Sequence, residues 1–187
     1  MTYNVKDLIA LTSRKKCKYV LFWGHKNRGK EMTKTCLSQW YPSPFSETNG
    51  IRYATAEHYM MERKAVMFNA FDLAEEILKD DDPARAKALG RQVPNFDPDI
   101  WDARKYYLVI AGNRLKFFQN EPLKTYLLST GKRILAEASP KDLVWGTGLT
   151  EDHPDAKNPA RWRGSNLLGF ALMRVRSELF MRRQRGG

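Results

Sequence analysis

Two Asp-Pro pairs in the middle of the chain are the feature that most limits how it can fold. In Asp82-Pro83 and in Asp97-Pro98, the aspartate can cap a helix and the proline suits the first helical position. The first pair predicts a short helix that ends at Gly90. The second predicts a longer helix, because the apolar residues after it recur every three, four or seven positions. The centre of the chain is therefore expected to be helical.

The flanking segments predict more helices and very few strands. Helices are expected over 56–71 and 123–129, from a capping-box-like start at 139–142, and from about Ser165 onwards. Two short strands are expected, over 18–23 and 51–54, and a Gly-, Pro- and Asp-rich loop over 146–165. We therefore predict a mainly α fold with a small N-terminal β element. Its single compact domain spans 18–180, between an N-terminal extension (1–17) and a basic C-terminal tail (181–187).

Charge and composition limit the classes of partner. The 187 residues suit one domain, and the formal net charge is +11. This charge fits either an anionic partner, such as a phosphorylated metabolite or nucleic acid, or a soluble surface with a basic tail. No apolar run has the length of a membrane span, the first residues do not resemble a signal peptide, and two cysteines suit a reducing compartment. We expect no membrane contact and a cytoplasmic protein, with the nucleus as the alternative.

Several common catalytic motifs are missing. The sequence contains no GxSxG motif and no P-loop, and neither cysteine lies in a known nucleophile motif. The three histidines lack the spacing of a metal site. Proteases, kinases and classical dehydrogenases are therefore poor matches, and we expect no metal and no organic cofactor.

The helix expected over 56–71 carries two charged residues in the middle of its apolar stripe. At 100° per residue, Glu57 and Lys64 fall on a stripe roughly 120° wide. The apolar members of this stripe are Met60, Met61, Met67, Phe68 and Phe71. The two charges lie two turns apart, about 10 Å along the axis, too far for a direct i,i+4 ion pair. An acid and an amine are thus directed toward the interior without each other as partner.

Two interpretations of this pair stay open from spacing alone. Burying an unpaired charge costs several kcal/mol or shifts its pKa until it is neutral. Each residue could find a separate buried partner, or Lys64 could extend to the edge of the core. Alternatively, the pair forms the floor of a cleft, where an acid and an amine with shifted pKa values serve catalysis.

A second candidate region is the loop before the last helix. Gly164 and Asn166 lie at a helix N-terminus, where free backbone N–H groups could bind a phosphate, although a plain helix cap is an equal explanation. Four tryptophans adjoin loop residues and could cover the core or stack on a flat heterocycle: Trp23, Trp40, Trp145 and Trp162. Trp101 is expected in the core. Arg91 is a candidate phosphate contact, or a solvated helix end.

Taken in order, several segments resemble the NADAR (YbiA-like) family. They are FWG at 22–24, LSQWYPSPF at 37–45, ATAEHYMMERKAVMF at 54–68, AKALGRQV at 86–93, LLSTGKRILAEASPKDLVWGTG at 127–148 and WRGSNLLGFALMRVRSEL at 162–179. The order of the six segments over most of the chain makes the resemblance specific. The sequence departs from the family pattern at Gln39, where asparagine is expected, and in a longer loop over 25–35.

This resemblance implies a compact YbiA-like domain with N-glycosidase activity on ribosyl compounds. Some members act on phosphoribosylamino-pyrimidine intermediates of riboflavin biosynthesis, and others remove ADP-ribose from modified guanine in nucleic acid. The implied catalytic residues are Lys64, Glu57 and Asn166. The substrate-binding candidates in the matching segments are Trp23, Gly24, Ser38, Trp40, His58, Arg91, Trp145, Gly146, Trp162 and Gly164. The expected partners are a small phosphorylated ribosyl compound or ADP-ribose, or ADP-ribosylated DNA or RNA.

Two mechanisms and three functions follow as hypotheses. Glu57 acts as acid or base on an oxocarbenium-like ribosyl group, or an uncharged Lys64 attacks C1 and forms a Schiff base while Glu57 moves protons. We favour the lysine mechanism, because an amine in an apolar stripe suits a lowered pKa. The functions are removal of ADP-ribose from guanine, hydrolysis of a riboflavin-pathway intermediate, or non-catalytic binding of a nucleotide.

Overall fold

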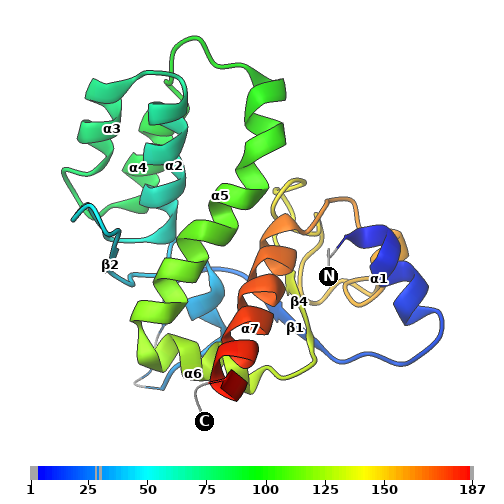
Figure 1. Cartoon of the computed structure of the whole chain (residues 1–187). Helices are drawn as coiled ribbons and strands as arrows, with labels where there is room; N and C mark the ends of the chain where they lie inside the picture. Colours follow the sequence, from blue (N-terminus) through cyan, green and yellow to red (C-terminus); the bar gives the residue numbers. More distant parts are fainter. Residues whose placement is uncertain (1–3, 28, 30, 186–187) are drawn as a thin grey trace. The chain divides into compact units, whose positions relative to one another are not determined.

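The computed structural model describes residues 4–27, 29 and 31–185, which cluster into two compact units. Unit 1 combines the N-terminal part up to Ser38 with the C-terminal part from Pro122, and unit 2 is Gln39–Glu121. The described elements are mainly helices, as Figure 1 shows, which confirms the predicted mainly α class. None of the described helices is both long and apolar enough to cross a bilayer.

Unit 2 is a helical cluster built around one central helix. α2 (Ala56–Met67) packs against α3 (Phe71–Ile77), α4 (Pro83–Gly90) and α5 (Pro98–Gln119). The side chain of Thr55 caps α2, and the two Asp-Pro pairs start α4 and α5 as predicted. A short antiparallel pair, β2 (Phe45–Ser46) and β3 (Arg52–Tyr53), completes this unit.

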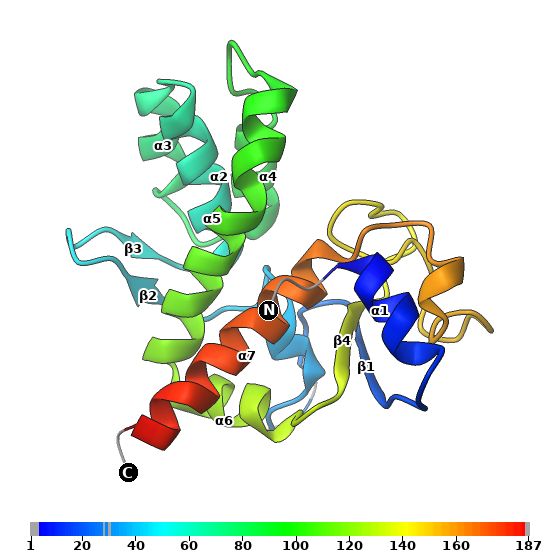
Figure 2. The same ribbon diagram turned by 45° about the vertical axis from the view of Figure 1, so that its right-hand side comes forward.

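Unit 1 is organised by two parallel strands that are far apart in the sequence. β1 (Tyr19–Phe22) pairs with β4 (Ile134–Glu137), and α7 (Leu167–Arg185) packs against β4. Figure 2 shows the two strands side by side. α6 (Glu121–Ser129) precedes β4. α1 (Val5–Thr12) lies against the 3₁₀ turn Pro159–Arg161 and buries Leu8, and a second such turn spans Lys34–Leu37.

Two local expectations were wrong, and one strand was not predicted. Residues 139–142 form a turn and start no helix. The helix expected over 56–71 ends at Met67, and Phe71 starts the separate helix α3, because Asn69 adopts a left-handed conformation (φ 58°) between them. The strand β4 (ILAE) was not predicted, since a buried run of three apolar residues has no period that separates strand from helix.

The ends of the predicted domain stay a prediction. The helix α1 lies within the expected N-terminal extension, and α7 continues to Arg185 in the segment expected as a basic tail. The strands expected over 18–23 and 51–54 are confirmed in shortened form as β1 and β3.

We expect Gly169→Ala to destabilise unit 1, because α7 approaches the backbone of β4 closely at this residue. A Cβ atom on Gly169 would lie 2.1 Å from the carbonyl oxygen of Leu135 and 2.6 Å from the amide of Asn166. Overpacking of this kind costs about 1–3 kcal/mol. Chemical denaturation should show this loss, whereas Gly29→Ala, which adds a Cβ in open space, should change the free energy of unfolding by less than about 0.5 kcal/mol. Equal stability of the two variants would contradict the close packing.

Candidate active site

Lys64 occupies a half-buried aromatic setting near the end of α2. Its Nζ donates a hydrogen bond of 2.7 Å to the carbonyl oxygen of Gly90, at the end of α4. The ammonium lies 4.1 Å from the ring centroid of Phe96 and 5.8 Å from that of Trp101. Burial lowers the pKa of the Lys64 ammonium, and no other cause contributes clearly. The amine is therefore easier to deprotonate than an exposed lysine and still reachable.

Three residues surround Lys64: Arg91, which was expected at the site, and Trp101 and Phe96, whose place at the site was not predicted. Arg91 follows Gly90 directly and is exposed, which suits a contact with an anionic ligand. Trp101, expected in the core, is only partly buried, and Phe96 lies in a turn with its ring against Phe68 at 5.3 Å. No helical period points to Phe96, so its place beside the lysine could not be derived from spacing.

Glu57 lies in the first turn of α2 and is only 3% exposed. Its backbone N–H donates to the carbonyl oxygen of Gln39 at 3.0 Å. The side chain of Gln39 accepts a hydrogen bond of 2.7 Å from Asn113 on α5. Gln39, the position that departs from the family pattern, thus holds the start of α2 and the middle of α5 together.

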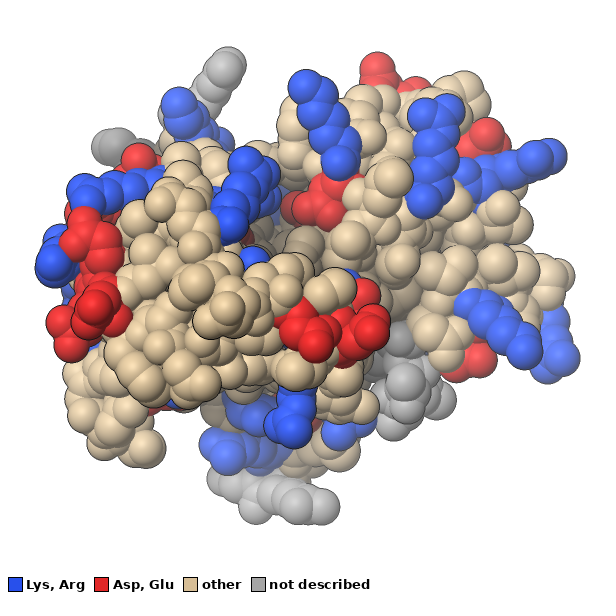
Figure 3. Space-filling model, turned by 90° about the horizontal axis from the view of Figure 1, so that it is seen from above, with Lys and Arg blue, Asp and Glu red and all other residues tan. Residues whose placement is uncertain are grey.

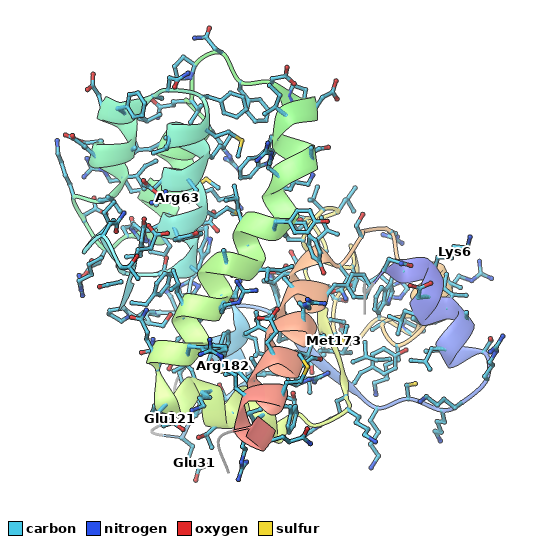
Figure 4. The ribbon with its side chains drawn as sticks, viewed as in Figure 1. Lys6, Glu31, Arg63, Glu121, Met173 and Arg182 are labelled. Carbon is cyan, nitrogen blue, oxygen red and sulfur yellow. The ribbon has the colours of Figure 1, made fainter. Side chains whose placement is uncertain are left out.

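A buried ion-pair network next to Lys64 was not predicted. Arg63, labelled in Figure 4, forms ion pairs with Glu62 at 2.8 Å and with Glu47 at 2.7 Å, and donates to the hydroxyl of Tyr53 at 2.9 Å. Burial raises the pKa values of Glu62 and Tyr53, with Arg63 opposing both shifts. In this network Arg63 compensates the buried charge of Glu62. We therefore assign the network a structural role, which is to hold α2 against the β2–β3 pair.

His58, Trp40 and Ser38 differ in how accessible they are. His58 is 1% exposed, and its Nδ1 lies 2.8 Å from the Thr55 hydroxyl, which also accepts from the His58 backbone N–H. Trp40 is partly buried, with Lys87 Nζ 5.6 Å from its ring centroid. Ser38, in unit 1, is buried at the end of a 3₁₀ turn. Their roles as substrate contacts stay predictions.

In unit 1, the backbone N–H groups before and at the start of α7 are already bonded. Those of residues 165–168 donate to the carbonyl oxygens of residues 143–146, at distances of 2.9–3.2 Å. Of the two explanations left open by the sequence, these bonds favour the plain helix cap over a phosphate site made by free backbone N–H groups. The loop over 142–148 caps α7 in place of an anion.

The same loop explains why glycine and asparagine occur there. A Cβ on Gly164 would lie 2.4 Å from the carbonyl oxygen of Gly146, so the close approach is within the loop. Asn166 is fully buried with φ 50°; its amide donates to Leu135 O at 3.1 Å and accepts from Glu137 N–H at 3.0 Å. The structure thus brings Gly146, Gly164 and Asn166 together beside β4. These contacts are structural, and a catalytic role for Asn166 stays a prediction.

The three tryptophans of unit 1 differ in exposure, and one of them has its ring anchored by a hydrogen bond. Trp23 is 58% exposed and precedes Gly24, which has φ 76° and open space around it. Trp162 packs on the cluster of Leu21 and small residues, and its indole N–H donates to Ala156 O at 3.0 Å. Trp145 is partly buried, and its backbone N–H is held by Asp142. Trp23 is therefore the ring best placed to stack on a ligand.

No candidate metal centre is present in the described part of the chain, since it contains no cluster of three or more His, Cys, Asp or Glu residues that could bind an ion. Neither Cys17 nor Cys36 forms a disulfide.

Residues 21–180 match the family model of the NADAR domain. The chain belongs to this family. It is 43% identical to N-glycosidase R617 of Acanthamoeba polyphaga mimivirus over 86% of this chain and 96% of the viral protein. N-glycosidase YbiA of Escherichia coli (strain K12) is 29% identical over 71% of this chain and 74% of that protein. The solved NMR structure of E. coli YbiA has a TM-score of 0.71 at 23% identity and covers 91% of this chain and 89% of its own, which shows the same fold.

Other NADAR relatives have different names and are longer. The riboflavin biosynthesis protein VVA0006 of Vibrio vulnificus is 34% identical over 76% of this chain. The match spans only 35% of that protein.

We expect the stability of the protein to fall as the pH drops below the ordinary histidine pKa of about 6.5. Burial lowers the pKa of His58, only partly opposed by the aspartates at 80–82, so the unfolded chain takes up a proton before the folded one. A single such group can change the free energy of unfolding by up to about 1.4 kcal/mol per pH unit. His58→Asn should remove this pH-dependent contribution to stability. Between pH 8 and pH 5, the variant should therefore lose less of its free energy of unfolding than the natural chain, as measured by urea unfolding. Parallel profiles would contradict the buried, uncharged imidazole.

Proposed function

We propose that this chain is an N-glycosidase that removes ADP-ribose from ADP-ribosylated guanine in nucleic acid or in a nucleotide. Hydrolysis of an N-glycosyl bond is the activity named for its viral and bacterial NADAR relatives. The observation that carries the proposal is the half-buried Lys64, hydrogen-bonded to Gly90 O beside two aromatic rings and with a lowered pKa.

The setting of Lys64 supports covalent catalysis by the amine. When uncharged, Nζ attacks C1 of the ribosyl group, the bond from C1 to the guanine nitrogen breaks, and the base leaves with a proton. Opening of the sugar ring gives a Schiff base, which water hydrolyses to release ADP-ribose and restore the lysine. Burial favours the uncharged amine, whereas the faces of Phe96 and Trp101 by themselves attract the ammonium. We assign the proton transfers to Glu57, two turns earlier on the same helix.

One observation supports ADP-ribosylated guanine as the substrate. The relative named N-glycosidase R617, 43% identical and matched over nearly its whole length, supports the N-glycosidase reaction but its name gives no substrate. The net charge of +11 suits a substrate that carries a pyrophosphate or a nucleic acid backbone. Arg91, exposed next to the Lys64 hydrogen bond, is our candidate for a phosphate contact in unit 2.

A phosphoribosylamino-pyrimidine of riboflavin biosynthesis is the alternative substrate. The similarity to the Vibrio vulnificus protein and to plant proteins with riboflavin biosynthesis names favours it. Those proteins are much longer than the matched region, so the similarity covers only a part of each.

Trapping with borohydride should show an adduct on Lys64. Reduction during turnover should fix a ribosyl group to a peptide containing this residue, detected by mass spectrometry, because reduction makes a Schiff base permanent. Lys64→Arg should abolish the adduct and lower kcat by about 10²- to 10⁴-fold, because a guanidinium remains protonated. Lys79→Arg, an exposed lysine paired with Glu76, is the matched control and should keep the activity. Full activity of Lys64→Arg would exclude the lysine mechanism and leave the oxocarbenium-like one.

The substrate should be identified by a direct comparison. We expect release of ADP-ribose from an oligonucleotide carrying ADP-ribosylated guanosine, with a kcat/KM at least about tenfold above that for the phosphoribosylamino-pyrimidine. Chromatography of the released sugar phosphates measures both reactions. A preference for the pyrimidine would support the alternative, and no turnover of either compound would overturn the proposal in favour of a nucleotide-binding module.

A further inference from the structure

The positive charge of the chain is concentrated in one of the two units. Unit 1 contains 21 of the 32 Lys and Arg residues and 8 of the 21 Asp and Glu residues, whereas unit 2 contains 11 basic and 13 acidic residues. Lys and Arg side chains project from several places on the face shown in Figure 3. The excess charge is therefore a property of unit 1 and does not belong to the unit that holds Lys64.

Part of this charge surrounds a cavity of about 510 Å³ formed by two distant segments. Residues 15–18 line one part and residues 129–133 another. The parallel pairing of β1 with β4 brings them together, since the N–H of Ile134 donates to Lys18 O at 2.9 Å. The cations at the cavity, which we call the basic cleft, are Lys15, Lys16, Lys18, Lys132 and Arg133.

The basic cleft is not neutralised by the protein. All five cations are exposed, no acidic residue lines the cavity, and none of the five forms an ion pair within the described residues. Arg133 is nevertheless fixed, because its guanidinium donates to Ser129 O at 2.6 Å and to Thr130 O at 3.0 Å. Arg176, buried beneath, donates to Thr130 Oγ1 and to Arg133 O. Gathering like charges without acids disfavours folding, so a mobile or bound anion must compensate them.

The shape and charge of the cleft favour a chain of phosphates over other anions. Five cations on two segments exceed what one isolated phosphate can pair with, whereas successive phosphates of a polynucleotide can contact them in turn. A single strand can follow the depression between the two segments and contact cations on both, whereas a flat lipid bilayer does not follow it. We propose that the basic cleft binds the phosphodiester backbone of a nucleic acid. This goes beyond the proposed reaction, which needs only the modified nucleotide, and binding can be tested without turnover.

Removing charge from the cleft should weaken nucleic acid binding. The test compares the natural chain with the triple variant Lys15→Ala, Lys16→Ala and Lys132→Ala. Fluorescence anisotropy of a labelled, unmodified single-stranded DNA at several salt concentrations measures Kd. We expect Kd to rise by about tenfold or more, and the slope of log Kd against log salt to fall by about 2, since each phosphate contact on a single strand contributes about 0.7.

A matched variant separates the cleft from overall charge. Three exposed cations of unit 1 that do not line the cavity are replaced by alanine: Lys6, Lys157 and Arg183. This variant loses the same net charge and should change Kd less than about twofold. Circular dichroism and thermal unfolding check that both variants fold. Equal losses in the two variants would overturn the proposal, as would binding of phosphatidylserine vesicles without binding of DNA.

Activity on a small substrate separates this inference from the proposed function. The cleft variant should hydrolyse ADP-ribosylated guanosine monophosphate with unchanged kcat/KM. Binding of DNA as expected, with no hydrolysis by the natural chain, would leave the cleft in place and reject the proposed reaction. Hydrolysis by the natural chain without binding of DNA would support the proposed reaction and overturn the proposal for the cleft.

Discussion

Burial of α2 on nearly all its sides is the constraint on which unit 2 depends. Residues 56–62 are all buried, although three of them are Glu57, His58 and Glu62. Such groups are stable inside only if neighbouring residues compensate them. Arg63 and the hydroxyl of Tyr53 do so for Glu62, and Thr55 does so for His58. Lys64 lies later on α2, where the helix is only partly buried, so its side chain remains reachable.

In unit 1 the equivalent constraint is the pairing of two strands from opposite ends of the sequence. β4 receives β1 on one edge, and Asn166 holds its backbone at Leu135 and Glu137. Because the loop over 142–148 caps α7 with its own carbonyl oxygens, the start of that helix cannot act as an anion site. The backbone N–H groups at this helix start therefore serve the fold, while a catalytic role for the Asn166 side chain stays a prediction.

Sequence reasoning succeeded where the signal was local and failed where it depended on distant contacts. The caps at Asp82 and Asp97 act within a few residues, so spacing predicted them. The predicted apolar stripe was wrong in extent, because residues 56–62 are all buried and Phe71 is exposed at the start of α3. β4 depends on a partner more than a hundred residues away in the chain. Phe96, which lies over the Lys64 ammonium, comes from a turn with no period at all. The end of α2 depended on a left-handed Asn69, a conformation that asparagine permits but does not require.

The division of charge between the units bears on how Lys64 acquires its lowered pKa. Unit 2 is nearly neutral, and no neighbouring cation contributes clearly to the shift, which arises from burial. A pKa lowered by burial depends on packing, so it follows the positions of Phe96 and Trp101 and changes little with salt. Binding of a nucleic acid backbone by exposed cations has the opposite property, because it weakens steeply as salt rises. The chemistry and the capture of substrate therefore respond to different physical variables, and salt can alter the second while leaving the first intact.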